Sequence, residues 1–375
     1  MATKIIQAVA GAGKTFYITH KLGKNQRSLY ITYTNGNVRN LRNELRETDK
    51  DCGMYMVRTF SKFVIDWFIR PFYPLLVPNC GTFKGFTTVE PVNNSRLPNY
   101  VKKSDRRHYV DKNNNLYLSR LSELVLNQGK DFFTKAFQRI GKYVDVIFID
   151  EYQDFTGKDF DLIKKMLKQK FFDVVLAGDV FQAGVVNSQS KGRGLKKIST
   201  YKLGQEIKSF LNKILEVPKN TEIDTTSLLK SQRISIECAS FVHKYLKIPI
   251  ESVGKTKGKV FYINDLERLK QLDFEEIDTI LVYDRRTCHS IQNKRYTSWT
   301  YSKGDTYDNV LLVLTNTSSF IANKDITEDE LNSYLKKMST VTRNRLYVAL
   351  TRSQGNLYVV NSEAWKELNK VKGRL

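Results

Sequence analysis

The chain has 375 residues, of which 41% are hydrophobic, a composition typical of a folded protein with two or three domains. No run of about 18 uninterrupted apolar residues occurs, which argues against a membrane-spanning helix. Lys and Arg number 61 against 39 Asp and Glu, and the resulting formal charge of +22 favours a polyanionic partner, above all nucleic acid.

The N-terminal segment and the cysteine spacing bear on the cellular compartment. The chain leads almost directly into its first motif, so we expect no signal peptide and a cytoplasmic location, in the host cytoplasm if the protein is viral. The four cysteines are far apart, without a C-x-x-C pair or a neighbouring His. This spacing favours free thiols over a zinc site or a disulfide framework.

The first predicted elements are a strand, a glycine-rich turn and a helix around the segment AVAGAGKT, which begins at Ala8. This order is the context of a phosphate-binding loop, although the strict pattern has glycine at the first position. Gly11 and Gly13 allow backbone N–H groups to turn toward a phosphate. Lys14 would reach the β- and γ-phosphates, and the Thr15 hydroxyl would bind Mg²⁺. A turn with a chance Lys-Thr pair is the alternative.

Two later apolar runs, DVIFIDEYQDF and DVVLAGDVFQ, predict buried parallel strands that end in polar residues. Ligands in α/β sheets bind at these carboxyl ends. Asp150 would hold Mg²⁺ through water, Glu151 would orient or deprotonate the attacking water, and Gln182 would sense the γ-phosphate. Apolar residues at i, i+3 and i+7 over 160–167 predict the buried face of a connecting helix.

In this order, the motifs resemble those of superfamily 1 helicases of the UvrD/Rep type. That family's loop is usually written A-G-A-G-x-G-K-T, so Ala8 is the expected residue. Further segments are similar to its motifs in chain order: ITYTNGNVRNLRNEL (31–45), VRTFSKFV (57–64), IDEYQD (149–154), LLKSQRIS (228–235), TYSKGDTYDNVLLV (300–313) and RNRLYVALTRSQGNLYVV (343–360).

The resemblance implies an α/β fold with two RecA-like P-loop domains, each a mainly parallel sheet flanked by helices. We expect a discontinuous first domain at 1–69 and 141–215. A small inserted accessory subdomain would occupy 70–140, and the second domain would occupy 216–375. The chain leaves too little room for the family's second, larger insertion, so it looks like a minimal motor.

For the nucleotide, the resemblance implies ATP and Mg²⁺, with Thr15 and Asp150 at the metal. The catalytic residues would be Lys14, Asp150, Glu151, Gln182 and the two arginine fingers Arg233 and Arg352. The residues around ATP would be Ala8, Ala10, Gly11, Ala12, Gly13, Lys14, Thr15, Phe16, Gln232, Gly304 and Thr306. Gln232 stands where the family has a tyrosine that stacks on adenine, and Thr306 replaces a glutamate beside the ribose.

For single-stranded DNA, the family positions correspond to Thr32, Tyr33, Thr34, Asn35, Thr59 and Phe60. Tyr33 and Phe60 offer aromatic faces for bases, and Trp299 precedes the Lys-Gly pair of a later motif. Core packing is the alternative for each of these three rings. Asn187 stands where relatives carry an aromatic residue that stacks on a base.

Within the insertion, residues 95–115 carry six cations with interleaved tyrosines. This pattern predicts a loop or hairpin that touches phosphate through Lys102 and Arg106, with a solvated loop as the alternative.

We therefore expect a monomeric ATP-dependent helicase or translocase that moves 3′ to 5′ on single-stranded or forked DNA, together with replication or recombination proteins and without a membrane partner. Three alternatives remain open: a translocase or remodeller without intrinsic unwinding, an RNA helicase, and a nucleic-acid-binding protein with an inactive ATPase. The intact catalytic set argues against the last.

Overall fold

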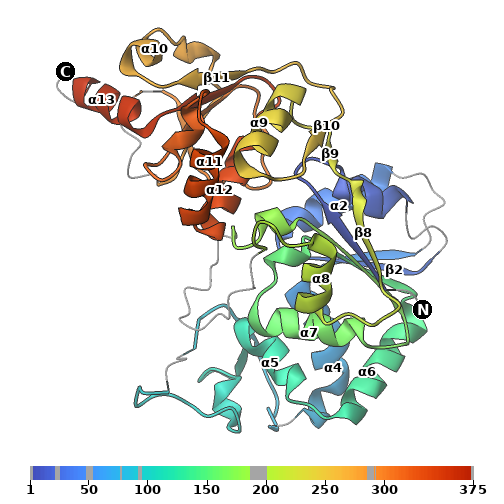
Figure 1. Ribbon diagram of the computed structural model, residues 1–375. Helices are drawn as coiled ribbons and strands as arrows, with labels where there is room; N and C mark the ends of the chain where they lie inside the picture. The colour runs from blue at the N-terminus through green and yellow to red at the C-terminus, as the bar shows by residue number, and fades with distance from the viewer. Residues whose placement is uncertain are drawn as a thin grey trace.

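The computed structural model describes residues 3–21, 26–47, 54–76, 78–91, 95–185, 201–284, 291 and 293–372. Two parallel sheets, each flanked by helices, form two bodies, and Figure 1 shows them stacked along the long axis of the molecule. We call the elements packed on the first sheet the first domain and those packed on the second sheet the second domain. The predicted α/β class is confirmed.

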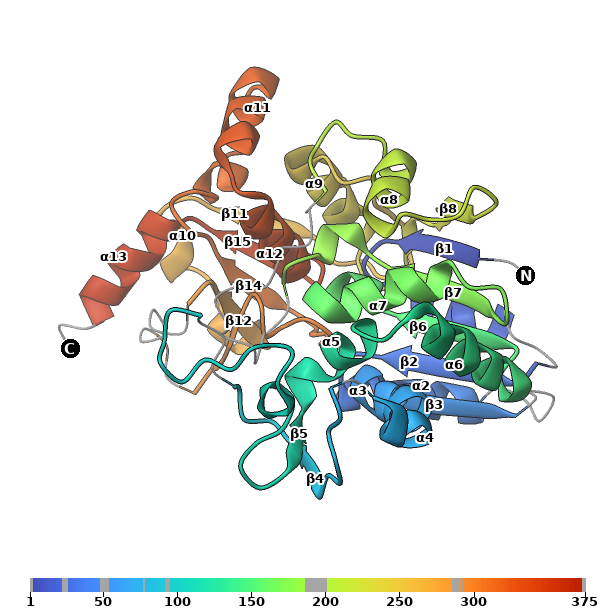
Figure 2. The ribbon, with the colours of Figure 1, turned by 90° about the horizontal axis from the view of Figure 1, so that it is seen from below.

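The first sheet has six parallel strands in the order β3-β2-β6-β7-β1-β8, and most of this order can be followed in Figure 2. The strands are β1 (Thr3–Ala8), β2 (Ser28–Thr32), β3 (Tyr55–Thr59), β6 (Val146–Asp150), β7 (Asp173–Gly178) and β8 (Glu222–Leu228). β2 and β6 are buried along their whole length, as expected for strands covered by helices on both faces.

Helices connect and cover these strands. They are α1 (Lys14–Phe16) with a following π-helical turn (Tyr17–Lys21), α2 (Asn35–Glu47), α3 (Phe60–Val64), α6 (Lys130–Tyr143), α7 (Gly157–Leu167) and α8 (Ile207–Leu215). α7 buries Leu162, Ile163, Met166 and Leu167, which confirms the predicted connecting helix.

The second sheet has five parallel strands in the order β11-β15-β14-β12-β13. The strands are β11 (Val260–Ile263), β12 (Thr279–Val282), β13 (Arg295–Ser298), β14 (Val310–Val313) and β15 (Leu357–Val360). The helices are α9 (Ile236–Leu246), α10 (Leu266–Lys270), α11 (Glu328–Lys337), α12 (Thr340–Leu350) and α13 (Ser362–Lys372). No helix in the described ranges is long and apolar enough to cross a bilayer.

The chain passes from one domain to the other later than the sequence predicts. β8 pairs in parallel with β1, so the first sheet continues to Leu228, beyond the expected boundary at residue 215. Because β8 is an edge strand with mostly polar or half-exposed residues, it lacks the apolar run that marks the other strands. The short strands β9 (Lys230–Ser231) and β10 (Glu251–Ser252) then pair with each other.

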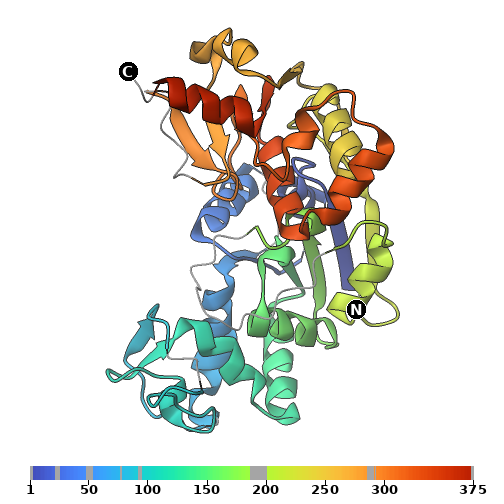
Figure 3. The ribbon, with the colours of Figure 1, turned by 60° about the vertical axis from the view of Figure 1, so that its left-hand side comes forward.

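The insertion expected at 70–140 divides into two parts. Its first part begins with α4 (Arg70–Phe72), which lies beside α6 (Figure 1), with the Phe72 ring 5.2 Å from that of Phe132. It continues through β4 (Gly85–Thr87) and β5 (Asn115–Tyr117), which project from the first domain away from the second (Figures 1 and 3). An antiparallel bridge between Val110 and Leu116 closes a hairpin there. Its second part, α5 (Leu121–Leu126) and most of α6, packs on the first domain, where the Phe137 ring lies 5.9 Å from that of Phe172.

A tight contact of α6 provides a test of this packing. A Cβ added at Gly141 would lie 2.5 Å from the Phe171 carbonyl oxygen, so Gly141→Ala should lower the free energy of unfolding by about 1–3 kcal/mol. Gly36→Ala in α2 is the control, because its Cβ would meet nothing closer than 3.7 Å and alanine favours helix. Urea unfolding of both variants measures the two changes; a stabilising Gly141→Ala would contradict the packing of α6.

Candidate functional site

The glycine-rich loop after β1 has the geometry that a phosphate-binding loop requires. Gly11 and Gly13 have φ of 73° and 78°, in the left-handed region where only glycine avoids strain. Ala8, Ala10 and Ala12 are buried, so the loop has room only for small side chains. Gly13 directly precedes α1, whose first residue is Lys14. The loop therefore leads directly into the N-terminus of a helix, the arrangement in which backbone N–H groups bind phosphate in other proteins.

The acidic pair at the end of β6 lies against this loop. Lys14 Nζ is 3.2 Å from Glu151 Oε1, and Thr15 Oγ1 lies 3.4 Å from Asp150 Oδ2. Glu151 has φ of 55°, so the chain turns sharply there. The Asp150 side chain contacts Thr15, whereas the Glu151 side chain contacts Lys14. The structure thus brings together four of the predicted residues from distant parts of the sequence.

Their charges depend on one another. Burial disfavours the charged form of Lys14, but Glu151, Asp179 and Asp150 outweigh this effect and raise the pKa of Lys14. Burial also acts on Glu151, but the positive charges of Lys14 and Lys303 lower its pKa below the ordinary value. Burial and the charge of Glu151 raise the pKa of Asp150. A hydroxyl and a carboxylate in this position suit a divalent cation, whose charge would favour ionised Asp150.

Asp179, which follows β7, is a buried acceptor at the centre of the site. It is 0% exposed, and its carboxylate accepts hydrogen bonds from Gln182 Nε2 at 2.8 Å and from the Tyr347 hydroxyl at 3.1 Å. The Tyr347 hydroxyl accepts a bond from the Ala10 N–H at 2.8 Å. Tyr347 lies on α12, so one side chain of the second domain joins the loop to the end of β7. It lies within the predicted motif RNRLYVALTR, although it was absent from the predicted site.

Gln153 fixes the spacing between β6 and β7. Its side chain donates to Glu151 and accepts the Asp179 N–H at 3.0 Å. A Cβ at Gly178 would lie 2.3 Å from Gln153 Oε1, so this position excludes any side chain. The glutamine of the DEYQD motif and the glycine before Asp179 therefore have a packing explanation.

The second domain also contacts the loop through residues 231–233. Gln232 N–H donates to the Gly11 carbonyl at 2.9 Å. A Cβ at Gly11 would lie 2.6 Å from Ser231 Oγ and 2.7 Å from Arg233 Cβ, so the loop and this segment pack in direct contact. Both predicted arginine fingers lie near it: Arg233 in this segment, and Arg352 after α12.

Arg352 is a buried cation with neutral partners. It is 2% exposed, and it donates to the carbonyls of Val348 and Asp305 at 2.8 and 3.1 Å. Burial and the charge of Arg233 lower the pKa of Arg352 to about 9. Within the described ranges no ion pair joins either arginine to a carboxylate. Because buried cations are costly without a counter-charge, this part of the site favours an anion.

Lys303 is a second residue that the predicted site did not include. It pairs with Asp154 and lies 3.9 Å from Glu151 Oε2. Since Lys303 comes from the second domain, the DEYQD segment carries an interdomain ion pair. Lys303 is the lysine of the Lys-Gly pair in the segment TYSKGDTYDNVLLV, and this motif position could have identified it from the sequence.

The other predicted ATP residues occupy the rim. Gln232 lies over the loop, because its Nε2 would be 3.3 Å from a Cβ at Gly13, and its Oε1 accepts from Lys255 at 3.0 Å. Phe16 is exposed and stacks on His20 at 4.0 Å. Gly304 and Thr306 flank Asp305, the backbone partner of Arg352, and Thr306 is exposed.

Among the predicted nucleic-acid residues, three are in the interior. Phe60 is 2% exposed and packs on Phe155 at 5.0 Å, and Trp299 is 0% exposed beside Tyr283 at 5.4 Å. Thr32 is buried between the sheet's neighbouring strands. In this conformation the rings of Phe60 and Trp299 are enclosed by protein and offer no face to a base, as the core-packing alternative expects.

The accessible residues lie at the ends of β2 and β3. Tyr33 is half-buried, with its ring edge-on to Phe155 at 5.5 Å. Thr34 and Asn35 are exposed, and Thr59 is half-buried and caps α3 by accepting the Lys62 N–H at 3.4 Å. These four residues form a polar edge with one accessible ring.

In the insertion, one of the predicted phosphate-binding cations is bonded to other residues of the insertion. Arg106 donates to the Cys80 carbonyl and to Asn114 Oδ1 at 2.9 Å, so this predicted phosphate contact instead ties two loops together. Lys102 is exposed, as the prediction requires. Asn187 lies outside the described residues.

Comparison with known proteins gives distant structural similarity. No family model and no curated protein matches the sequence. The crystal structure of Arterivirus nonstructural protein 10 (helicase) is 16% identical, with a TM-score of 0.47 over 99% of this chain and 62% of that one. The complex of that helicase with DNA is 14% identical, with a TM-score of 0.44 over 98% of this chain and 62% of that one. The structure of PRRSV helicase is 12% identical, with a TM-score of 0.45 over 96% of this chain and 52% of that one. The chain thus spans less than two thirds of these viral proteins, and none is described as UvrD- or Rep-like.

The Tyr347–Asp179 contact can be measured with a double-mutant cycle. Tyr347→Phe removes the acceptor of the Ala10 N–H and one of the hydrogen bonds to Asp179, and it should lower the free energy of unfolding by about 1–3 kcal/mol. Combined with Asp179→Asn, the two losses should be non-additive by about 0.5–3 kcal/mol. Tyr245→Phe, which removes a hydrogen bond to the Asn323 carbonyl within the second domain, should be additive with Asp179→Asn. Additivity in both cycles would mean that the interdomain contact carries no coupling.

Proposed function

We propose that the protein is an ATP-dependent helicase or translocase that moves on single-stranded DNA in the 3′ to 5′ direction. The observation that carries the proposal is the meeting of a phosphate-type loop and an ion-paired glutamate with two arginines of the other domain, the buried Arg352 and the half-buried Arg233. Such a site can bind a triphosphate from one side and neutralise its developing charge from the other.

Each side chain has a defined task in hydrolysis. Lys14 would bind the β- and γ-phosphates, and its pairing with Glu151 keeps it charged and close to the loop. Thr15 and Asp150 would hold Mg²⁺, which supplies positive charge at the phosphates. Glu151, kept ionised by Lys14 and Lys303, would orient the attacking water and accept its proton. Gln182 would report on the γ-phosphate through Asp179.

The second domain completes the site, which supports coupling of hydrolysis to movement. Arg233 and Arg352 would bind the transferred phosphoryl group, so hydrolysis would proceed only with the domains together. Tyr347 and Lys303 contact the first domain at the same site. A change in the nucleotide would therefore change the relation of the domains and, with it, the hold on a strand at the ends of β2 and β3.

The choice of DNA rests on the sequence segments TYTN and DEYQD, which are similar to the DNA branch of the resembling family. Stepping from 5′ to 3′ would overturn that branch assignment. The small insertion favours the second candidate, translocation without intrinsic unwinding, since accessory subdomains often supply the strand-separating element. Parallel translocation and unwinding assays separate these two candidates.

Steady-state ATP hydrolysis tests the proposal directly. We expect strong stimulation by single-stranded DNA and little by single-stranded RNA, and Lys14→Ala should abolish turnover while DNA binding persists. Stimulation by RNA alone would replace the DNA assignment with an RNA helicase. Absence of basal and stimulated activity in the wild type would leave a binding protein with an inactive site.

Arg352→Ala tests the arginine-finger role. ATP binding should persist, while the hydrolysis rate should fall by roughly 10³-fold, the lower range measured for such fingers. Arg345→Ala, on α12 just before Arg352, is the control, because the Arg345 guanidinium instead donates to the Tyr283 hydroxyl. Fluorescent-nucleotide binding and single-turnover hydrolysis measure the two quantities. Equal losses of binding and rate would assign Arg352 a structural role.

A further inference from the structure

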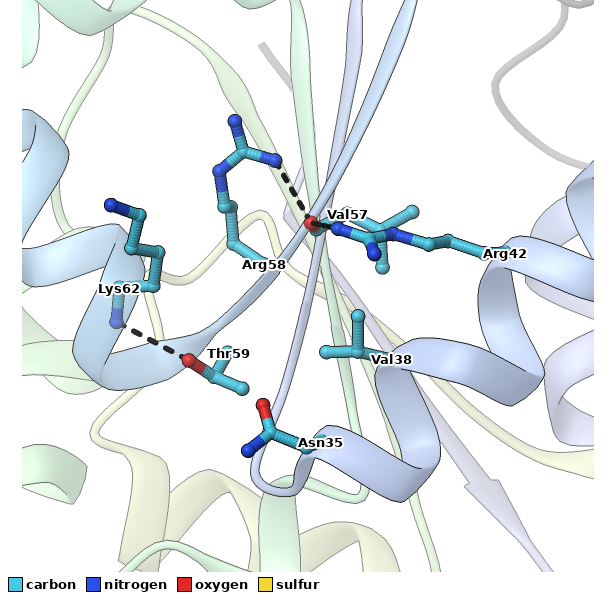
Figure 4. A pocket seen from close by; sticks show the side chains of 7 residues that line it. All are labelled: Asn35, Val38, Arg42, Val57, Arg58, Thr59 and Lys62. Carbon is cyan, nitrogen blue, oxygen red and sulfur yellow. Dashed lines mark hydrogen bonds between the residues drawn. The ribbon is translucent and has the colours of Figure 1, made fainter.

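A hollow of about 400 Å³ lies on the outer edge of the first sheet, away from the nucleotide site. Its walls come from the N-terminal half of α2, the edge strand β3 and the first turn of α3 (Figure 4). The polar lining consists of Asn35, Arg42, Arg58, Thr59 and Lys62. No residue of the proposed ATPase site lines it, so it needs a separate explanation.

Two guanidinium groups share one neutral acceptor in this hollow. Arg42 Nη2 and Arg58 Nη1 lie 3.4 and 3.1 Å from the Val57 carbonyl oxygen, and Figure 4 shows them approaching it from opposite sides. Each guanidinium has five N–H donors, and a single carbonyl can satisfy few of them. The remaining donors suit an anion with several oxygens, such as a phosphate.

The local charge is positive. Asp66 is the carboxylate that forms ion pairs here, with Arg58 at 3.5 Å, Lys62 at 3.2 Å and Arg70 at 3.2 Å. Arg42 adds a fourth cation, for which no ion pair occurs within the described ranges. One negative charge thus faces four positive charges, on a chain whose formal charge is +22. An anion is attracted to such a surface.

The hollow continues the polar edge at the ends of β2 and β3. Asn35 and Thr59 belong to both the hollow and the set of residues expected to touch the strand. Thr32 and Thr59 are register partners, so the two strands end side by side. A strand lying along Thr34 and Asn35 would reach Arg42 and Arg58 on passing the sheet edge.

We propose that this hollow binds consecutive backbone phosphates of the single strand, with Arg42 and Arg58 as ligands of one phosphate and Lys62 of the next. The inference rests on the proposed function and extends its nucleic-acid path from Asn35 and Thr59 to three further cations of the same two motif segments at the outer edge of the sheet. The competing explanation is that the two arginines only shield the edge strand β3 from pairing with another chain.

The test is equilibrium binding of a 20-nucleotide fluorescent strand at several salt concentrations. Arg42→Gln/Arg58→Gln should weaken binding on the order of tenfold, the loss expected for charge-assisted hydrogen bonds. The slope of log affinity against log salt should become shallower by about 0.7 for each phosphate that the variant no longer neutralises. Arg139→Gln/Lys213→Gln, which removes two positive charges from exposed positions of α6 and α8, should keep the wild-type affinity and slope.

Lys62→Gln is a second variant of the hollow, in case the double arginine variant folds poorly. It leaves both bonds to the Val57 carbonyl in place, because they come from Arg42 and Arg58. It should also make the slope shallower by about 0.7. Wild-type slope and affinity in both hollow variants, or equal losses in the control, would overturn the hollow as a strand site while leaving a DNA-stimulated ATPase intact. A wild-type protein that binds no single strand would instead overturn the proposed function.

Discussion

The carboxylate of Asp179 holds the site together, because it is fully buried and its oxygens accept hydrogen bonds from both domains. Burial raises the pKa of this group, and the charge of Lys14 and the hydrogen bond from Gln182 act in the opposite direction. The Tyr347 hydroxyl then connects it to the loop N–H of Ala10. Loop, β7 and α12 are therefore joined by hydrogen bonds in a place that water does not reach, where such bonds are strong and costly to break.

The geometry around the proposed nucleotide site could be anticipated from the sequence because its elements are local. A loop with two glycines before Lys14, and an apolar strand before Asp150, determine their own geometry. That Arg233 and Arg352 would lie near the same site was predicted from the order of the motifs alone, since the sequence gives no distances. Tyr347 and Lys303 were missed since their roles depend on contacts across more than a hundred residues of sequence, which no spacing rule reveals.

Some residues proposed to contact a strand lie in the interior, and the sequence could not reveal this for a physical reason. Phe60 and Trp299 have large apolar rings, and the same property serves a core and a base-stacking surface equally. Arg106 shows the corresponding ambiguity for charge, because the same guanidinium donors can bond loop carbonyls or phosphates. β8 was missed since most of its residues are polar or partly exposed, and its place in the sheet depends on pairing with β1.

The position of β8 has a mechanical consequence. Its last residue, Leu228, is the register partner of Ala8 and accepts the Val9 N–H at 2.9 Å, and Gln232 already bonds the Gly11 carbonyl. The covalent joint between the domains thus lies against the phosphate-type loop itself. Because the connecting segment bonds the loop at Val9 and at Gly11, a displacement of the loop would be transmitted to the start of the second domain through hydrogen bonds and not through a free linker.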